Sequence, residues 1–81
     1  MSGLLLALDA GGSTTRALVL DPTGVPLGTG RAGAGNPTAV GGETAVAALR
    51  TAVAGALSTA GATPADLTQV CLLYTSDAAD E

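Results

Sequence analysis

The chain has 81 residues, a formal net charge of −4, three arginines, no lysine and a single cysteine. The lack of a basic patch argues against nucleic-acid binding, and one cysteine cannot form an internal disulfide. No apolar run is long enough to span a bilayer, and no basic segment of a signal peptide is recognisable, so a cytoplasmic location without a membrane partner is expected. A chain this short, with only 1% aromatic residues, buries a small core and is expected to be part of something larger.

Three short strands are expected in the first part of the chain. Leu4–Leu8 is a short continuous apolar run, which is typical of a strand covered on both faces. Thr15–Leu20 is the second strand, and Val25–Arg31 is a weaker third one, whose two glycines indicate a sheet edge or a bend. Asp21–Gly24 has the Pro and Gly of a tight turn. Such short connections predict an antiparallel meander.

A helix is expected from Glu43 to Ala60, after a segment rich in glycine and proline. Its larger apolar residues recur at helical spacing and predict one buried stripe, formed by Val46, Leu49, Val53 and Leu57. Gly61 stands where a C-terminal cap belongs. The following residues can start a short turn of helix with Asp66 as a capping residue. A fourth strand then begins at Gln69–Val70.

The final segment, Cys71–Glu81, differs in character from the rest of the chain. It holds the only tyrosine and three of the seven acidic residues. It resembles the translation of a transposase adapter used in DNA sequencing libraries rather than a natural acidic terminus. We therefore expect two regions, with residues 1–70 a truncated N-terminal domain and residues 71–81 an artefactual tail. Cys71–Leu73 can continue the fourth strand by mimicry, whereas the polar and acidic Thr75–Glu81 is expected to be disordered or attached only by chance. The arginines are not expected to cluster and hold this tail, and Arg16 is expected on a solvated strand face.

The residues that could carry chemistry lie in the loop between the first two strands, Asp9-Ala10-Gly11-Gly12-Ser13-Thr14-Thr15. A Walker loop needs a lysine, and a dinucleotide-binding loop leads into a helix, so neither type fits. In a strand–turn–strand loop, glycines let backbone N–H groups approach a phosphate, and hydroxyls can donate to it. The candidate phosphate-binding residues are Gly11, Gly12, Ser13 and Thr14. Asp9 can hold Mg²⁺ through water. An ordinary polar hairpin explains the loop alone equally well.

The surroundings of this loop resemble a known family. The pattern D-x-G-G-[ST]-x-[ST]-x-x-x-[VL]-x-D, a β-turn, a strand, Gly35-Asn36-Pro37 and a helix resemble the N-terminus of the BadF/BadG/BcrA/BcrD ATPase family. That family includes N-acetylglucosamine kinase and glucosamine kinases and belongs to the actin-like ATPase superfamily. The resemblance covers Leu4 to about Val70. It implies an α/β fold of ribonuclease H-like type, with a three-strand meander, a helix and the start of a fourth strand.

The resemblance also implies roles for individual residues. By this resemblance, Asp9 would serve the metal–phosphate site, and Gly11, Gly12, Ser13 and Thr14 would line the phosphates of ATP. Asn36 would touch the sugar. Ala10 replaces a frequent third glycine and Ser13 a usual threonine, and both changes are mild. Asn36 could instead only cap its own turn, as Asn before Pro often does. The implied activity is ATP- and Mg²⁺-dependent phosphorylation of an amino sugar such as N-acetylglucosamine or glucosamine. A homodimer is left open for the intact protein.

The resemblance implies that parts of the active site are missing from these 81 residues. In the family, the general base that deprotonates the sugar hydroxyl follows the fourth strand, beyond Val70. No catalytic residue is therefore expected here, and the chain alone should be inactive. Two alternatives stay open. An ATPase activator of a dehydratase or reductase would need cysteine ligands for an iron–sulfur cluster, and no cysteine precedes Cys71. The other is a non-catalytic fragment or interaction module.

Overall fold

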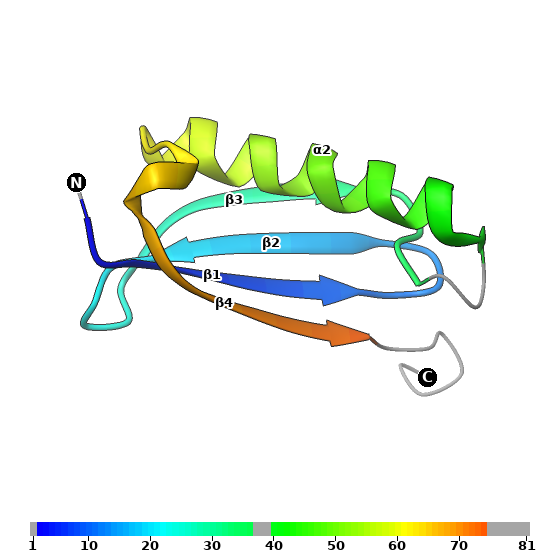
Figure 1. The fold of residues 1–81 in the computed structure, drawn as a ribbon, viewed down its shortest axis with the longest axis horizontal. Coiled ribbons are helices and arrows are strands. Elements are labelled where there is room, and N and C mark those ends of the chain that lie inside the picture. The colour runs from blue at the N-terminus through cyan, green and yellow to red at the C-terminus, as the bar shows by residue number, and fades with distance from the viewer. Residues whose placement is uncertain (1, 37–39, 75–81) are drawn as a thin grey trace.

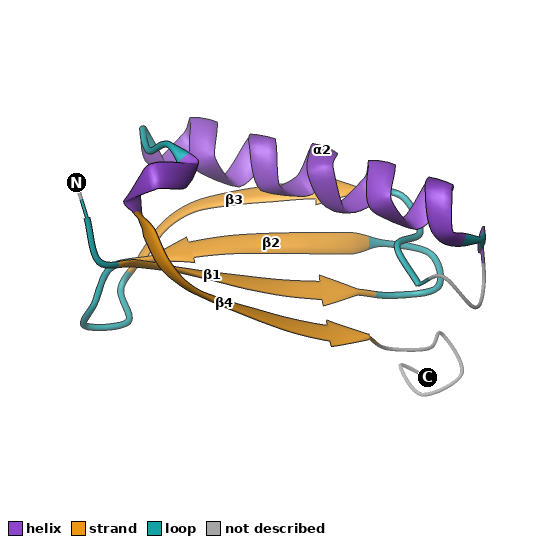
Figure 2. Ribbon diagram, in the orientation of Figure 1, coloured by secondary structure: helices purple, strands orange, loops and turns teal. Residues whose placement is uncertain are grey.

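The computed structural model describes residues 2–36 and 40–74. Its elements follow the chain in this order (Figures 1 and 2): β1 (Leu4–Ala10), β2 (Thr15–Leu20), β3 (Pro26–Ala32), α2 (Gly42–Ala60), the 3-10 helix η1 (Pro64–Asp66) and β4 (Leu67–Tyr74). The expected strands and helix are confirmed to within about two residues of the bounds that the sequence predicts.

The four strands form one sheet in the order β3-β2-β1-β4. β1, β2 and β3 are antiparallel neighbours, which confirms the predicted meander, and β4 lies parallel to β1 on its other side. The helix α2 carries the chain from one edge of the sheet to the other across one face (Figure 1). Since β1 and β4 are parallel, their carboxyl ends lie at the same end of the sheet. The candidate phosphate loop begins at this end, directly after β1.

The core lies between α2 and one face of the sheet. Along β1 the buried side chains alternate with half-buried ones, and the buried set is Leu4, Leu6, Leu8 and Ala10. β2 adds buried Ala17 and Val19 on the same side. The expectation that β1 is covered on both faces is wrong, because Leu5 and Ala7 on the other face are only half-buried. A continuous apolar run gave no sign of this alternation, since leucine and alanine occupy both faces.

The helix meets the sheet mainly through small residues. The buried residues of α2 are Ala45, Ala48, Ala52, Ala56 and Leu57. Leu49 and Val53 lie beside this stripe and are partly buried against the core. Val46 is 47% exposed, so the predicted stripe of large residues is wrong at that position. The larger side chains lie along one flank of the helix because alanine, not leucine, fits the narrow space above β3.

Two glycines of β3 create that narrow space. A Cβ at Gly28 would overlap the backbone of α2 at Ala56 and Ala60, and a Cβ at Gly30 would overlap it at Ala52 and Ala56. Their lack of a side chain lets the helix rest directly on the strand, and α2 packs chiefly on β3 and β2. The prediction that these glycines indicate a sheet edge is confirmed, because β3 is an edge strand.

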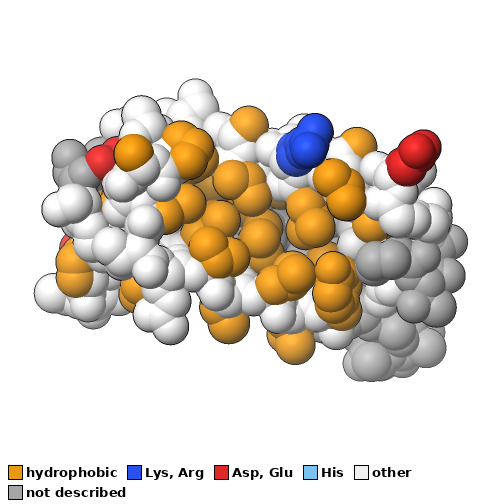
Figure 3. Space-filling view, viewed as in Figure 1, with side chains coloured by type: hydrophobic (Ala, Val, Ile, Leu, Met, Phe, Trp, Pro, Cys, Tyr) orange, Lys and Arg blue, Asp and Glu red, His pale blue; other side chains and the backbone are white. Residues whose placement is uncertain are grey.

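β4 is exposed along most of its length. Val70, Leu72 and Tyr74 align with Leu6, Leu8 and Ala10 of β1, and they are 57%, 42% and 49% exposed. α2 does not extend over this strand, and hydrophobic side chains remain visible beside the helix in Figure 3. The expected boundary between residues 70 and 71 falls within β4, and the expectation for Thr75–Glu81 concerns residues outside the described ranges.

The C-terminal cap of α2 at Gly61 and the capping residue of the following short helix, Asp66, are both present as the sequence predicts. Gly61 adopts a left-handed conformation with φ 70°, and its N–H donates to the Ser58 carbonyl. At the start of η1, the Thr63 N–H donates to the Asp66 carboxylate at 2.9 Å. Asp66 is therefore confirmed as a capping residue, and this hydrogen bond lowers its pKa below the ordinary aspartate value.

The turn between β2 and β3 leads to a prediction about pH. The Asp21 carboxylate accepts hydrogen bonds from the Thr23 hydroxyl at 2.6 Å and the Val25 N–H at 3.0 Å, and these bonds, the Thr23 hydroxyl first, lower the pKa of Asp21. A lowered pKa means that the stabilisation is present above the unfolded value of about 3.9 and is lost as pH falls through the folded value. We expect NMR titration to show a higher Asp21 pKa in Thr23→Ala than in the wild type. An unchanged pKa would show that the hydroxyl is not responsible.

Candidate functional site

The candidate phosphate loop is a tight connection between β1 and β2. The Gly11 N–H donates to the Thr14 carbonyl at 2.9 Å and closes the turn. Gly11 is buried, Gly12 and Thr14 are half-buried, and Ser13 is exposed at the outer end of the loop. The chain continues directly into strand β2, so the predicted strand–turn–strand geometry is confirmed and a dinucleotide-type loop leading into a helix is excluded.

The segment after β3 folds back onto this loop. The N–H groups of Gly35 and Asn36 both donate to the Gly11 carbonyl, at 3.0 and 3.1 Å. The buried Thr15 hydroxyl donates to the Gly33 carbonyl at 2.8 Å. The structure thus brings together the two motifs that the sequence predicts separately, and Asn36 lies beside the candidate phosphate loop. Sequence reasoning gave Thr15 no role, although its hydroxyl is one of the fixed links between the segments.

Gly35 is required by the closeness of these segments. A Cβ at this position would overlap the Thr15 hydroxyl oxygen. We expect Gly35→Ala to push the Gly35–Asn36 segment away from Gly11, and hydrogen exchange of the Gly35-position and Asn36 amides to become at least tenfold faster, as for an opening made easier by about 1.4 kcal/mol. Gly33→Ala is the matched control in the same segment, because a Cβ there meets nothing within 4 Å. Unchanged exchange in Gly35→Ala would contradict this geometry.

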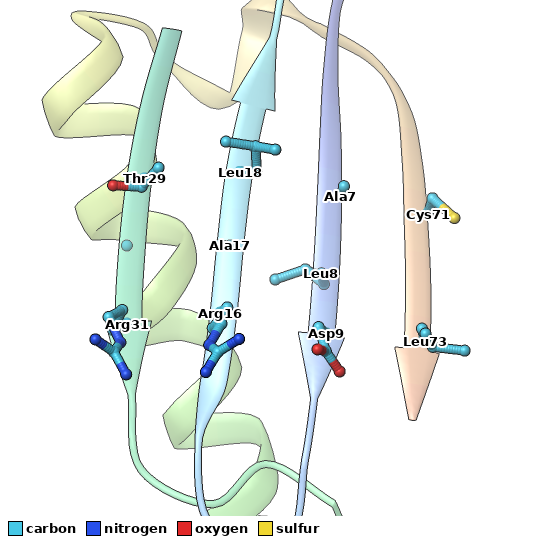
Figure 4. A pocket seen from close by; sticks show the side chains of 11 residues that line it. Ala7, Leu8, Asp9, Arg16, Ala17, Leu18, Thr29, Arg31, Cys71 and Leu73 are labelled. Atoms are coloured by element: carbon cyan, nitrogen blue, oxygen red, sulfur yellow. The ribbon is translucent and has the colours of Figure 1, made fainter. Parts of the chain in front are cut away.

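Asp9 is the second-to-last residue of β1, two residues before the loop begins at Gly11. It is half-buried, and it belongs to the face of the sheet opposite α2, where Figure 4 shows it beside Arg16 of β2. Asp9 and Arg16 are directly paired across the antiparallel strands. Within residues 2–36 and 40–74 no three metal-ligating side chains come together. A single carboxylate next to a phosphate loop still suits Mg²⁺, which is commonly held by one or two carboxylates, water and substrate phosphates.

Two arginines lie side by side on this face. Arg16 is exposed, as expected. Its cross-strand partner on β3 is Arg31, and the two guanidinium groups point the same way (Figure 4). The expectation that the arginines do not cluster is therefore wrong for this pair. Pairing follows from the register of β2 and β3, which composition does not reveal. Arg50 belongs to α2 and is exposed on the other side of the sheet.

The fold is an α/β arrangement with a β-meander, a crossing helix and a fourth strand parallel to the first, as expected for the N-terminal part of an actin-like domain. It matches 22 chains of solved structures. One is the crystal structure named "Putative N-acetylglucosamine Kinase from Chromobacterium violaceum", with a TM-score of 0.70 and 18% sequence identity. The match covers 90% of this chain and 35% of that protein, so the chain spans about a third of its neighbour's length.

Comparisons of the sequence itself found no relative. No protein-family model matches the chain, and no curated protein matches it. The likeness therefore establishes the fold, while the roles of individual residues depend on the geometry of the loop and its neighbours. Within the described ranges, no helix is both long and apolar enough to cross a membrane.

Proposed function

We propose that this chain is the N-terminal part of an ATP-dependent sugar kinase that phosphorylates an amino sugar of the N-acetylglucosamine or glucosamine type. One observation carries the proposal: the Gly11 carbonyl accepts hydrogen bonds from both Gly35 and Asn36. The residue with a side chain suited to a sugar hydroxyl is thereby held against the loop suited to phosphate. A kinase that joins these two substrates needs this closeness. The likeness in fold to a protein named as a kinase supports the proposal.

The residues of the Gly11–Thr14 loop have different roles in the proposed phosphoryl transfer. The Gly11 N–H is already bonded to Thr14, so Gly11 shapes the loop and anchors Asn36 through its carbonyl. The groups suited to the phosphates of ATP are the backbone N–H groups of Gly12 and Ser13 and the hydroxyls of Ser13 and Thr14. Donors fixed in advance near the transferred phosphoryl group stabilise the charge that develops in the transition state.

Asp9 is the residue suited to Mg²⁺. When bound, the metal would offset negative charge on the phosphates. Asp9 would hold it through water, because the carboxylate lies just before the loop rather than within it, and Mg²⁺ gives up its water reluctantly. Arg16 is the cross-strand neighbour of Asp9 on β2.

The general base is expected outside this chain. Two acidic residues in the described ranges lie close to β4: Asp9, which pairs with Leu73 and is proposed to hold Mg²⁺, and Asp66, which precedes the strand and caps η1. The loop lies at the other end of β4, which has 8 residues and so is about 26 Å long at roughly 3.3 Å per residue. A base must come within about 3 Å of the hydroxyl that it deprotonates. Asp66 therefore cannot serve, and the activity belongs to a longer gene product.

The proposal is tested by assaying that longer gene product with ATP, Mg²⁺ and a panel of glucosamine, N-acetylglucosamine and glucose. We expect a phosphorylated amino sugar as the product. Asn36→Ala should raise KM for the sugar about tenfold with little change in kcat, as expected for the loss of one hydrogen bond in the bound complex. ATP hydrolysis without sugar phosphorylation would contradict the proposal and favour an ATPase activator.

A further inference from the structure

The buried hydroxyl of Thr15 is a group beside the candidate site that the proposed mechanism does not use. Within the described ranges Thr15 is the only buried residue with a polar side chain, and its exposed fraction is 0%. It begins β2, the strand between β1 and β3, and pairs with Ala10 on one side and Ala32 on the other. A threonine side chain has few rotamers because it is branched at Cβ. The position of the hydroxyl is therefore fixed by the sheet.

Packing alone does not explain a hydroxyl at this position. The Thr15 side chain lies on the α2 side of the sheet, together with the apolar Ala17 and Val19 of the same strand. Valine has nearly the same shape and would fill this space, whereas a buried hydroxyl is destabilising unless it makes a hydrogen bond. Its partner is the Gly33 carbonyl, at 2.8 Å. What threonine adds here is thus a link to the segment after β3.

Residues 33–36 lie directly against this hydroxyl. A Cβ at Gly35 would overlap the Thr15 hydroxyl oxygen, so the Gly35 backbone passes in close contact with it. The backbone of the next residue, Asn36, is held at both of its polar groups. Its N–H donates to the Gly11 carbonyl at 3.1 Å, and its carbonyl accepts from the Val40 N–H at 3.2 Å. Thr15 therefore holds from the sheet the same short segment that Gly11 holds from the loop.

The Gly11–Thr14 loop is closed by a hydrogen bond in which the Thr15 hydroxyl has no part. The Gly11 N–H donates to the Thr14 carbonyl at 2.9 Å, and both groups belong to the backbone. The Thr15 hydroxyl instead donates to the segment that carries Asn36, and the side chain is buried away from any substrate. Loss of the hydroxyl should therefore loosen residues 33–36 and leave the loop closed.

We propose that Thr15 is a positioning residue for the sugar, whose hydroxyl holds residues 33–36 so that the Asn36 side chain meets the sugar beside the phosphate loop. This inference rests on the proposed function, in which Asn36 contacts the sugar. It assigns Thr15 an effect on sugar binding through Asn36 and no part in binding ATP. A residue that only stabilised the fold would not distinguish between the two substrates.

Kinetics of the longer gene product with ATP and an amino sugar test this role. Thr15→Val keeps the shape of the side chain and removes the hydroxyl. We expect the KM for the sugar to rise about fivefold, as for the loss of one ordinary hydrogen bond, with kcat and the KM for ATP within about twofold of the wild type. Thr15→Ser is the matched control, because it keeps the hydroxyl and loses a buried methyl group. Its KM for the sugar should stay within about twofold of the wild type, whereas a purely structural role would make it at least as impaired as Thr15→Val.

A double-mutant cycle shows whether Thr15 acts through Asn36. In Asn36→Ala the side chain that Thr15 is proposed to position is absent. Adding Thr15→Val to this variant should therefore raise the KM for the sugar by less than about twofold further. Effects that multiply in full would mean that the two residues act independently, and they would overturn the proposal.

Hydrogen exchange without any substrate distinguishes a failure of this role from a failure of the proposed function. In the same gene product we expect the Gly35 and Asn36 amides to exchange about fivefold faster in Thr15→Val than in Thr15→Ser. Equal exchange in the two variants, or an unchanged KM for the sugar in Thr15→Val, would overturn the positioning role while sugar phosphorylation by the wild type upheld the proposed function. If exchange differs as expected but no sugar is phosphorylated, the proposed function fails, and the role of Thr15 in sugar binding fails with it.

Discussion

Replacing Asp9 by asparagine in the longer gene product is expected to lower kcat at least 100-fold while leaving the fold intact. The two side chains have nearly the same shape, so β1 and its pairing with β2 should persist. The amide has no negative charge with which to hold Mg²⁺ beside the Gly11–Thr14 loop. Charge stabilisation of a phosphoryl-transfer transition state is commonly worth 100-fold or more per group removed. Steady-state kinetics with ATP and an amino sugar measure the effect.

Asp21→Asn provides the matched control for this experiment. It makes the same chemical change in the turn between β2 and β3, which Figure 1 shows at the opposite end of the sheet from the candidate loop. Its kcat should stay within about twofold of the wild type, as for a surface substitution distant from the chemistry. If Asp9→Asn retained full turnover at every Mg²⁺ concentration, the role proposed for Asp9 would be wrong.

The largest effect on stability is expected from Gly30→Ala. The added Cβ would overlap backbone atoms of α2 at Ala52 and Ala56, and backbone cannot move aside as the end of a long side chain can. Overpacking of this kind costs about 1–3 kcal/mol or more. A core this small supplies roughly 3–5 kcal/mol in total, so the variant should lose a large part of its stability. Urea denaturation followed by circular dichroism measures the change.

Gly42→Ala is the control for that substitution. A Cβ at Gly42 meets nothing within 4 Å, and the residue opens α2, where alanine is the better helix former. It should leave the free energy of unfolding unchanged or raise it by up to about 1 kcal/mol. Equal stability of Gly30→Ala and Gly42→Ala would show that α2 does not rest on β3 as described.

The positions of the strands and the helix could be predicted from the sequence because their ends carry strong local signals. Asp21–Gly24 and Gly61 stop their elements through turn and cap chemistry that depends on a few adjacent residues. The buried side of α2 could not be predicted in the same way. Hydrophobic size favoured the side with Val46, whereas close contact with a strand containing Gly28 and Gly30 selects alanine.

The candidate site was predicted as two separate motifs, and only the structure relates them. The hydrogen bonds from Gly35 and Asn36 to Gly11 join backbone groups, whose pairing depends on the path of the chain and not on side-chain type. The Arg16–Arg31 pair could not be found from sequence by counting outward from the Asp21–Gly24 turn. That count needs the irregularity in register between Val19 and Leu20, which no residue pattern announces.

The proposed function depends most on binding of the phosphates of ATP by the loop between β1 and β2. NMR of the ¹⁵N-labelled longer gene product, titrated with Mg²⁺ and a non-hydrolysable ATP analogue, tests it directly. We expect large shifts of the Gly12, Ser13 and Thr14 amides and none at Gly24, which lies in the turn at the other end of the sheet. Loop amides that stay unchanged at saturating nucleotide, or shifts of equal size at Gly24, would contradict the account.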